Sequence, residues 1–263
     1  PGGANSLRIP SMNAERQIRS VRLKKGIYVL PNLITTASLF MGFYSIIATI
    51  QEKFFVAAIA ILVSMVFDGL DGRIARITNT TSKFGAEYDS LSDLIAFGLA
   101  PSLLAFNWAM SSYGKLGWMA GFLFVACGAL RLARYNIQIG LIDSKFFNGL
   151  PIPAAAAVIA TTVIFVNDIM GIEGIFHNPY VMICVVILSF LMVSNIKYYS
   201  GKDMKLFARM PFMTFLVVVG VLLVIIYAPE VMIFVITVGY ALSGPVWWLC
   251  KVISKKSGDE PAQ

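Results

Sequence analysis

Long apolar stretches alternate with short polar connections along most of the chain. The apolar stretches cover about residues 31–50, 54–76, 84–112, 116–137, 151–170, 179–197, 212–228 and 230–250. Each is close to the roughly 20 residues that an α-helix needs to cross the hydrocarbon core of a bilayer. The pattern therefore predicts an all-α, polytopic transmembrane helical bundle of about eight spans.

The segment before the first span has a different pattern. Residues 12–26 are basic, and Ile18 and Val21 recur three residues apart, as in an amphipathic helix. We expect an N-terminal juxtamembrane helix that lies on anionic headgroups, although a basic anchor that only sets the topology would fit equally well. Residues 1–11 are expected to lie outside the fold, and Pro31 suits the first turn of the helix that follows.

Composition supports the membrane prediction. Hydrophobic residues make up 58% of the 263 residues and charged residues only 13%, whereas soluble domains carry about 25% charged residues. We attribute the net charge of +7 to contact with the membrane surface, because no basic and aromatic patch stands apart from the apolar stretches to bind nucleic acid. The three cysteines stand alone inside apolar stretches and predict buried thiols.

Four aspartates interrupt the apolar pattern where the second span ends and the third begins. Asp68 and Asp71 are three residues apart, and Asp89 and Asp93 are four apart, so each pair lies on one face of its helix. Antiparallel neighbouring helices would bring all four carboxylates together, which requires cations. Oxygen ligands without histidine or cysteine favour Mg²⁺ or Mn²⁺, and a pair of such ions suits phosphoryl transfer. A solvated acidic helix–loop–helix is the alternative, but the flanking runs are too apolar for it.

Residues 68–93 follow the pattern D-x2-D-G-x2-A-R-x8-G-x3-D-x3-D. This pattern resembles the signature of the CDP-alcohol phosphotransferases at every defined position. The resemblance implies an integral membrane enzyme that transfers a phosphatidyl-type group from a CDP-linked lipid, such as CDP-diacylglycerol, to an alcohol and releases CMP. It also implies that the four aspartates hold the metal ions and that Asp93 is the candidate general base, in addition to or instead of being a ligand.

The same resemblance suggests a donor site and a domain organisation. Gly72 and Ala75 leave room for a bulky ligand, and Arg76 offers charge to phosphate oxygens. The residues expected around the CDP moiety are Gly72, Ala75, Arg76 and Ser82, with Asn32 and Thr35 as weaker candidates. Because the family has a six-span core, we expect a lead and basic segment over 1–29, a membrane core over 30–200, and a loop, two extra helices and a tail over 201–263.

A second group of motifs concerns the acceptor. Arg131 and Arg134 share one helix face near Asn136 and could bind a carboxylate or a lipid phosphate, or could simply extend to the headgroups. Together, L-R-L-A-R-Y-N over 130–136 and G-L-P-I-P-A-A-A from Gly149 resemble the bacterial membrane-integral phosphatidylserine synthases, a branch of this family. That resemblance implies L-serine as the acceptor. Glycerol 3-phosphate or inositol phosphate would also need arginines, and an archaeal-type CDP-lipid donor stays open.

Charge predicts the orientation and the compartment. All of the 21 lysines and arginines except Lys53 and Lys115 fall on one side of the predicted spans, together with both termini and the aspartates. By the positive-inside rule this side is cytoplasmic, so we expect an integral protein of the cytoplasmic membrane with a cytoplasmic active site. The family is commonly dimeric, and Gly117 and Gly121 could form a helix contact in a homodimer.

One alternative belongs to another functional class. Intramembrane carboxylates at these spacings would also suit a divalent-cation transporter, although no acid continues the path at mid-depth. Pro101 lies inside the third span and is expected to bend it or to open a gap in its hydrogen bonds.

Overall fold

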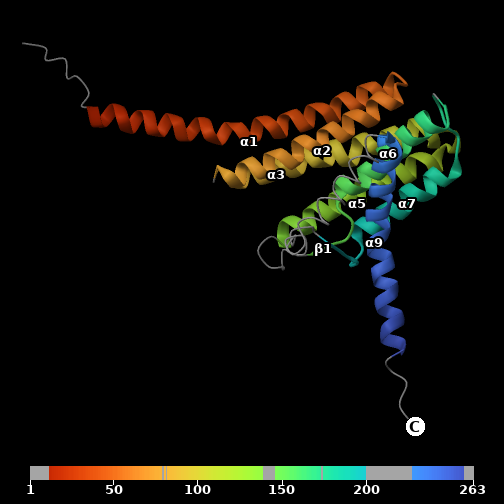
Figure 1. Ribbon diagram of the computed structural model, residues 1–263. Coiled ribbons are helices and arrows are strands. Elements are labelled where there is room, and N and C mark those ends of the chain that lie inside the picture. Colours follow the sequence, from red (N-terminus) through yellow and green to blue (C-terminus); the bar gives the residue numbers. More distant parts are fainter. Residues whose placement is uncertain are drawn as a thin grey trace, which may run out of the picture.

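The computed structural model describes residues 12–78, 80, 82–138, 146–172, 174–199 and 227–257. Over these residues the protein is a bundle of helices (Figure 1), which confirms the predicted helical membrane architecture. In the described part, six helices are long and apolar enough to cross a membrane, over residues 30–50, 54–77, 83–113, 115–138, 152–169 and 229–251. Residues 212–226 of the predicted span over 212–228 lie outside the described residues.

Helix α1 (Met12–Ile50) includes both the basic segment and the first span. The predicted N-terminal helix is therefore helical, but it is not a separate element, and Pro31 lies inside α1 instead of at the start of a new helix. Helix α2 (Phe54–Ile77) returns alongside α1 after a tight turn (Figure 1). The N-terminal part of α1 extends beyond the rest of the bundle.

The third span is one helical rod whose hydrogen-bond pattern changes along its length. It consists of α3 (Lys83–Asp93), the π-helix η1 (Leu94–Leu99), α4 (Ala100–Ala105), the π-helix η2 (Phe106–Met110) and the 3₁₀-helix η3 (Ser111–Tyr113). The Ala100 N–H donates to the Ile95 carbonyl, five residues back, just before Pro101. The change of pattern expected around Pro101 is therefore a π-helical segment, and it begins directly after Asp93.

The second half of the chain is helical apart from one short two-stranded sheet. Helices α5 (Lys115–Gln138), α6 (Ile152–Ile169) and α9 (Pro229–Ser257) agree with predicted spans. The predicted span over 179–197 is too long, because α7 (Pro179–Val193) ends where Ser194 adopts an extended backbone. The residues that follow form β2 (Lys197–Tyr199), which pairs antiparallel with β1 (Phe146–Asn148) in a two-stranded sheet.

Gly42 allows α1 to cross η1 at very short range. A Cβ atom at Gly42 would lie 2.6 Å from the Ala96 Cα and 2.8 Å from its Cβ. Ala96 is fully buried, and it belongs to the main hydrophobic core together with Phe97 of the same π-helix. The crossing fixes the position of the helical segment that starts at Asp93.

Substituting Gly42 by alanine should lower the thermal stability of the protein in detergent. The added methyl group meets backbone atoms that cannot move independently, and overpacking of this kind costs about 1–3 kcal/mol. Gly239→Ala in α9 is the matched control, because nothing lies within 4 Å of a Cβ at that position. Equal melting temperatures for the two variants would show that the crossing is looser than described.

Candidate functional site

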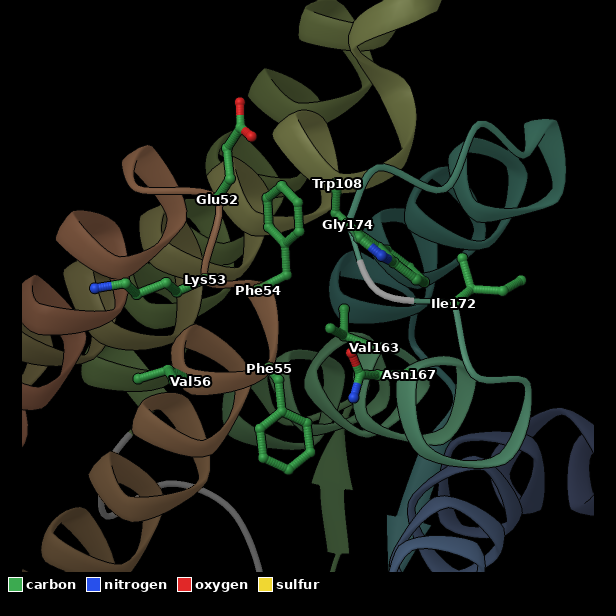
Figure 2. Close-up of a pocket in the computed structure, with 10 residues that line it drawn as sticks. All are labelled: Glu52, Lys53, Phe54, Phe55, Val56, Trp108, Val163, Asn167, Ile172 and Gly174. Carbon is green, nitrogen blue, oxygen red and sulfur yellow. The ribbon is translucent and has the colours of Figure 1, made fainter.

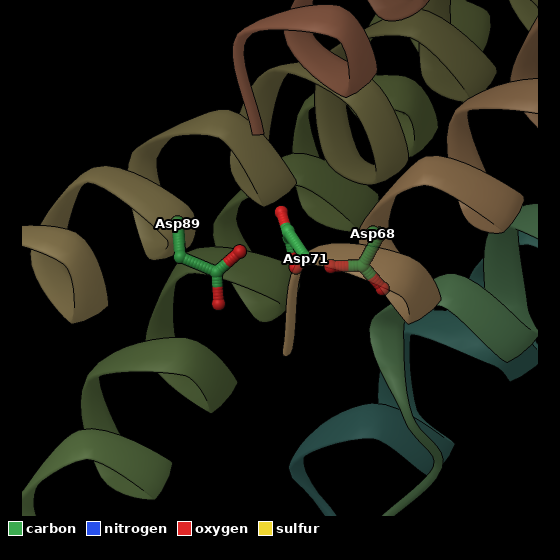
Figure 3. Close-up of side chains that lie close together, drawn as sticks. All are labelled: Asp68, Asp71 and Asp89. Carbon is green, nitrogen blue, oxygen red and sulfur yellow. The ribbon is translucent and has the colours of Figure 1, made fainter. Parts of the chain in front are cut away.

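The aspartates of α2 and α3 converge at the ends of their helices. One carboxylate oxygen from each of Asp68, Asp71 and Asp89 can be chosen so that all lie within 4.8 Å of one another. Figure 3 shows the three carboxyl groups pointing toward one another, two from α2 and one from α3. Asp93 is the fourth acid, and its carboxyl group interacts with that of Asp68. We refer to these four residues as the aspartate cluster.

The environment of the aspartate cluster fits a divalent cation. Asp71 is only 5% exposed, and the buried Oδ1 of Asp89 has no hydrogen-bond partner among the described residues. A buried carboxylate oxygen without a partner is unfavourable by several kcal/mol, and a bound cation removes this penalty. All the possible metal ligands in this cluster are hard oxygen atoms, which magnesium and manganese prefer.

Residues of α1 hold the aspartate cluster in position. The Thr35 hydroxyl donates to Asp71 Oδ2 at 2.6 Å, and the Ser92 hydroxyl donates to the Thr35 carbonyl at 3.2 Å. The next residue of α1 makes a further contact, because the hydroxyls of Thr36 and Tyr88 lie 2.9 Å apart. These bonds join α1 to the carboxylate-bearing ends of α2 and α3, and Thr35 contacts both helices.

The other candidates for the CDP moiety surround the connection between α2 and α3. Ser82 caps α3 by accepting a hydrogen bond from the Gly85 N–H at 3.0 Å, and Asn32 Oδ1 would lie 3.4 Å from a Cβ at Gly85. Arg76 is exposed and donates through Nε to the Gly72 carbonyl at 2.8 Å. Nothing lies within 4 Å of a Cβ at Gly72, so the surface beside Gly72 and Ala75 is open to a ligand.

The two arginines of α5 have different environments. Arg131 is 7% exposed, its Nε has no hydrogen-bond partner in the described part of the chain, and it interacts electrostatically with Asp93. Arg134 instead donates to the carbonyls of Asn148, Val193 and Ser194 at 2.8–3.2 Å and to Asn195 Oδ1 at 3.3 Å. Arg134 therefore ties β1 to the end of α7, while Arg131 is a buried cation whose charge interacts with Asp93.

Asn136 contacts a residue that the sequence analysis did not single out. Its amide nitrogen donates to the Ser90 hydroxyl at 3.0 Å, and Ser90 stands between Asp89 and Asp93 on α3. The contact links α5 to the aspartate cluster. The position of Ser90 inside the acidic pattern is the sequence signal that could have identified it.

A cavity of about 320 Å³ lies at the opposite end of α2 (Figure 2). Phe54, Trp108, Val163 and Ile172 supply much of its wall. Phe54 begins α2, whereas Asp68 lies 14 residues further along, which is about 21 Å on a helix. This cavity is therefore separate from the aspartate cluster.

Comparison with known proteins agrees with the site. The family model described as CDP-alcohol phosphatidyltransferase matches residues 28–191. The CDP-diacylglycerol–serine O-phosphatidyltransferase of Helicobacter pylori is 45% identical over 179 residues, which are 68% of this chain and 75% of that protein. The archaetidylserine synthase of Methanothermobacter thermautotrophicus is 37% identical over 171 residues, 64% of this chain and 69% of that protein. The protein is an integral membrane protein that belongs to the CDP-alcohol phosphatidyltransferase family.

Proposed function

We propose that this protein transfers a phosphatidyl group from CDP-diacylglycerol to the hydroxyl of L-serine, giving phosphatidylserine and CMP. The observation that carries the proposal is the convergence of the carboxyl groups of Asp68, Asp71 and Asp89. The names of the relatives support serine as the acceptor, because the Helicobacter pylori protein is a serine O-phosphatidyltransferase.

The aspartate cluster would hold the metal. Asp68, Asp71, Asp89 and Asp93 are the residues that would bind two ions of Mg²⁺ or Mn²⁺, with Asp89 Oδ1 in need of a partner. When bound, such ions neutralise the pyrophosphate of the donor and stabilise the charge that builds on phosphoryl oxygens. Thr35 keeps the Asp71 carboxylate in a fixed orientation through its 2.6 Å hydrogen bond.

Asp93 is the proposed general base. The serine hydroxyl is a weak nucleophile, so a positioned base must take its proton as the oxygen attacks the phosphorus attached to the lipid. A new bond forms between that oxygen and the phosphorus, the bond from the same phosphorus to the CMP oxygen breaks, and CMP leaves with the electron pair. Asp93 is the last residue of α3, directly before the π-helix η1, and the close crossing of α1 and η1 at Gly42 and Ala96 fixes the backbone that follows it.

The remaining candidate residues fall into two groups, one for the lipid donor and one for the acceptor. We propose that Gly72, Ala75, Arg76 and Ser82 surround the CDP moiety, with Asn32 and Thr35 at its inner edge. For the acceptor, the buried Arg131 would bind the serine carboxylate, because its charge interacts with that of Asp93 and its Nε lacks a partner in the described residues. Asn136 and Ser90 would contact the ammonium group of serine. The bonds of Arg134 to main-chain carbonyls support a structural role for that residue.

Orientation and assembly are further proposals. The distribution of lysine and arginine supports insertion in the cytoplasmic membrane with both termini and the aspartate cluster on the cytoplasmic side. A homodimer rests on the family resemblance alone. Gly117 and Gly121 do not support a homodimer, because both make contacts within one chain. Gly117 packs on the Met110 carbonyl, and the Gly121 carbonyl accepts a hydrogen bond from the Ser102 hydroxyl at 2.8 Å.

An acceptor assay tests the proposed reaction. CMP release by the purified protein should be measured with CDP-diacylglycerol and, in turn, L-serine, glycerol 3-phosphate and inositol phosphate. We expect release with serine only, because a carboxylate fits one buried guanidinium and a dianionic phosphate requires more charge. Release of CMP with glycerol 3-phosphate but not with serine would overturn the assignment of serine as the acceptor. Divalent-ion uptake into proteoliposomes without CMP release would favour the transporter instead.

A further inference from the structure

The cavity at the end of α2 opposite the aspartate cluster has aromatic side chains in its wall (Figure 2). Phe54 of α2 and Trp108 of η2 are buried, and Phe55 also lines the cavity. The volume of about 320 Å³ lies near the lower end of the range of about 300–1,000 Å³ that is typical of small-molecule sites. Aromatic faces attract ammonium groups as well as apolar groups, so this wall suits a ligand that carries an amine.

The connection between α6 and α7 closes one side of the cavity. Ile172 and Gly174 of this connection line it together with Trp108. The Phe176 N–H donates to the Trp108 carbonyl at 2.7 Å, and the rings of these two residues stack with their centroids 5.2 Å apart. Trp108 belongs to the π-helix η2, and π-helical turns occur frequently at functional sites. The indole ring is therefore held in place at the cavity.

The turn between α1 and α2 places a glutamate beside the cavity in an unfavourable backbone conformation. The Lys53 N–H donates to the Ala48 carbonyl at 2.9 Å and the Glu52 N–H to the Thr49 carbonyl at 3.0 Å, the pattern of a Schellman motif. Glycine is favoured at the position of Glu52, because φ there is positive. Glu52 has a φ of 61° and is the only non-glycine residue with a positive φ in the described part of the chain. A residue that is unfavourable for the fold at a cavity indicates a role in binding.

Two opposite charges are available beside the cavity. Glu52 and Lys53 both line it, and Figure 2 shows their charged ends pointing apart. Both side chains are exposed, so each can change rotamer and turn toward a bound group. Phe55 and Val56, at the start of α2, are also exposed on the surface of a membrane-spanning helix. A ligand with an ammonium group, a phosphate and acyl chains would match all of these groups.

We propose that this cavity binds the headgroup of a zwitterionic phospholipid from the leaflet opposite the aspartate cluster. The ammonium group contacts the Glu52 carboxylate and the Trp108 ring, and the phosphate contacts Lys53. The acyl chains leave the cavity along the exposed side of α2, at Phe55 and Val56. An anionic lipid without an amine binds less tightly, because it gives Glu52 no cation and adds a negative charge beside it. The cavity is separate from the aspartate cluster, so the proposal does not rest on the proposed reaction.

Lipid binding by the purified protein tests the proposal. Native mass spectrometry in detergent compares the binding of phosphatidylethanolamine and phosphatidylglycerol from an equimolar mixture. We expect phosphatidylethanolamine to bind at least about tenfold more tightly, since only this lipid offers a charged donor to the carboxylate. Glu52→Gln should reduce the preference to less than about twofold, whereas Glu87→Gln, the same change at an exposed glutamate of α3, should leave it unaltered. Equal binding of the two lipids by the wild type, or an unchanged preference in Glu52→Gln, would overturn the proposal.

Fluorescence of Trp108 tests where the lipid binds. The chain has four tryptophans, and replacing Trp118, Trp247 and Trp248 by phenylalanine leaves Trp108 alone. Phosphatidylethanolamine with brominated acyl chains should quench this fluorescence at a lower mole fraction in vesicles than brominated phosphatidylglycerol does. Equal quenching by the two lipids would show that the preferred lipid binds away from the cavity and would overturn the assignment.

Glu52→Gly separates binding from folding. Glycine adopts a positive φ without strain, so this variant should unfold at a temperature equal to or above that of the wild type. It should nevertheless lose the preference for phosphatidylethanolamine, because the carboxylate is gone. A variant that is stable and keeps the preference would show that Glu52 has no part in the site.

Discussion

Asp93→Asn should lower the rate of CMP release by about 10²–10⁴-fold, the range that a positioned general base contributes. Asparagine has nearly the same shape as aspartate, so the helical rod and the π-helix after residue 93 should be preserved. The amide cannot accept the proton of the serine hydroxyl. The measurement is the kcat of the purified variant with saturating CDP-diacylglycerol and L-serine.

The matched control is Asp168→Asn, which makes the same substitution at an exposed aspartate near the end of α6. Its turnover should equal that of the wild type. Full turnover by Asp93→Asn would remove Asp93 as the base. If Asp93→Asn loses activity and still binds Mn²⁺ as the wild type does, its main role is proton transfer; if both are lost, it is required as a ligand.

Removal of divalent ions should reduce CMP release at least about 100-fold, and addition of Mg²⁺ or Mn²⁺ should restore it. The reason is the set of possible metal ligands. Three carboxylate oxygens lie within 4.8 Å of one another. One of the three residues, Asp89, also has a buried oxygen without a hydrogen-bond partner among the described residues. Without cations the donor's pyrophosphate would meet four acidic groups. The assay compares protein treated with a chelator and protein resupplied with each metal, at constant ionic strength.

The control for this experiment is thermal unfolding of the chelated protein, which shows whether the fold persists. A chelated protein that remains folded and inactive fits the proposal. Unchanged turnover after complete removal of metal would contradict a metal-dependent transfer.

The sequence was sufficient for the helical membrane architecture and for the convergence of the aspartates, and the physical reasons are local. A bilayer requires about 20 apolar residues per helix, so the apolar pattern identifies the spans directly. Helical periodicity puts residues three or four apart on one face, which is why Asp68 and Asp71, or Asp89 and Asp93, could be paired. The family resemblance seen in residues 68–93 is likewise confirmed by the match over 28–191.

The roles of the two arginines could not be separated from the sequence. Arg131 and Arg134 share a helix face, but the carbonyls that bind Arg134 belong to residues 14 and about 60 positions away. Only the tertiary structure brings Asn148 and Val193 to α5.

Local changes in the backbone hydrogen-bond pattern also could not be predicted from the sequence. Pro101 indicates a missing N–H, but not whether the chain responds with a kink or with the π-helix that is observed. The early end of α7 follows from the extended backbone at Ser194 and the pairing of Lys197–Tyr199 with Phe146–Asn148. Pairing between segments separated by so many residues leaves no periodic signal in either of them.

Binding of Mn²⁺ to the purified protein tests the central claim most directly. Electron paramagnetic resonance should detect about two bound ions per chain in the wild type, as expected for a two-metal phosphoryl-transfer site. Asp68→Asn combined with Asp89→Asn should abolish this binding, whereas Asp168→Asn should leave it unchanged. A wild-type protein that binds no Mn²⁺, or a double variant that binds as much as the wild type, would contradict the account.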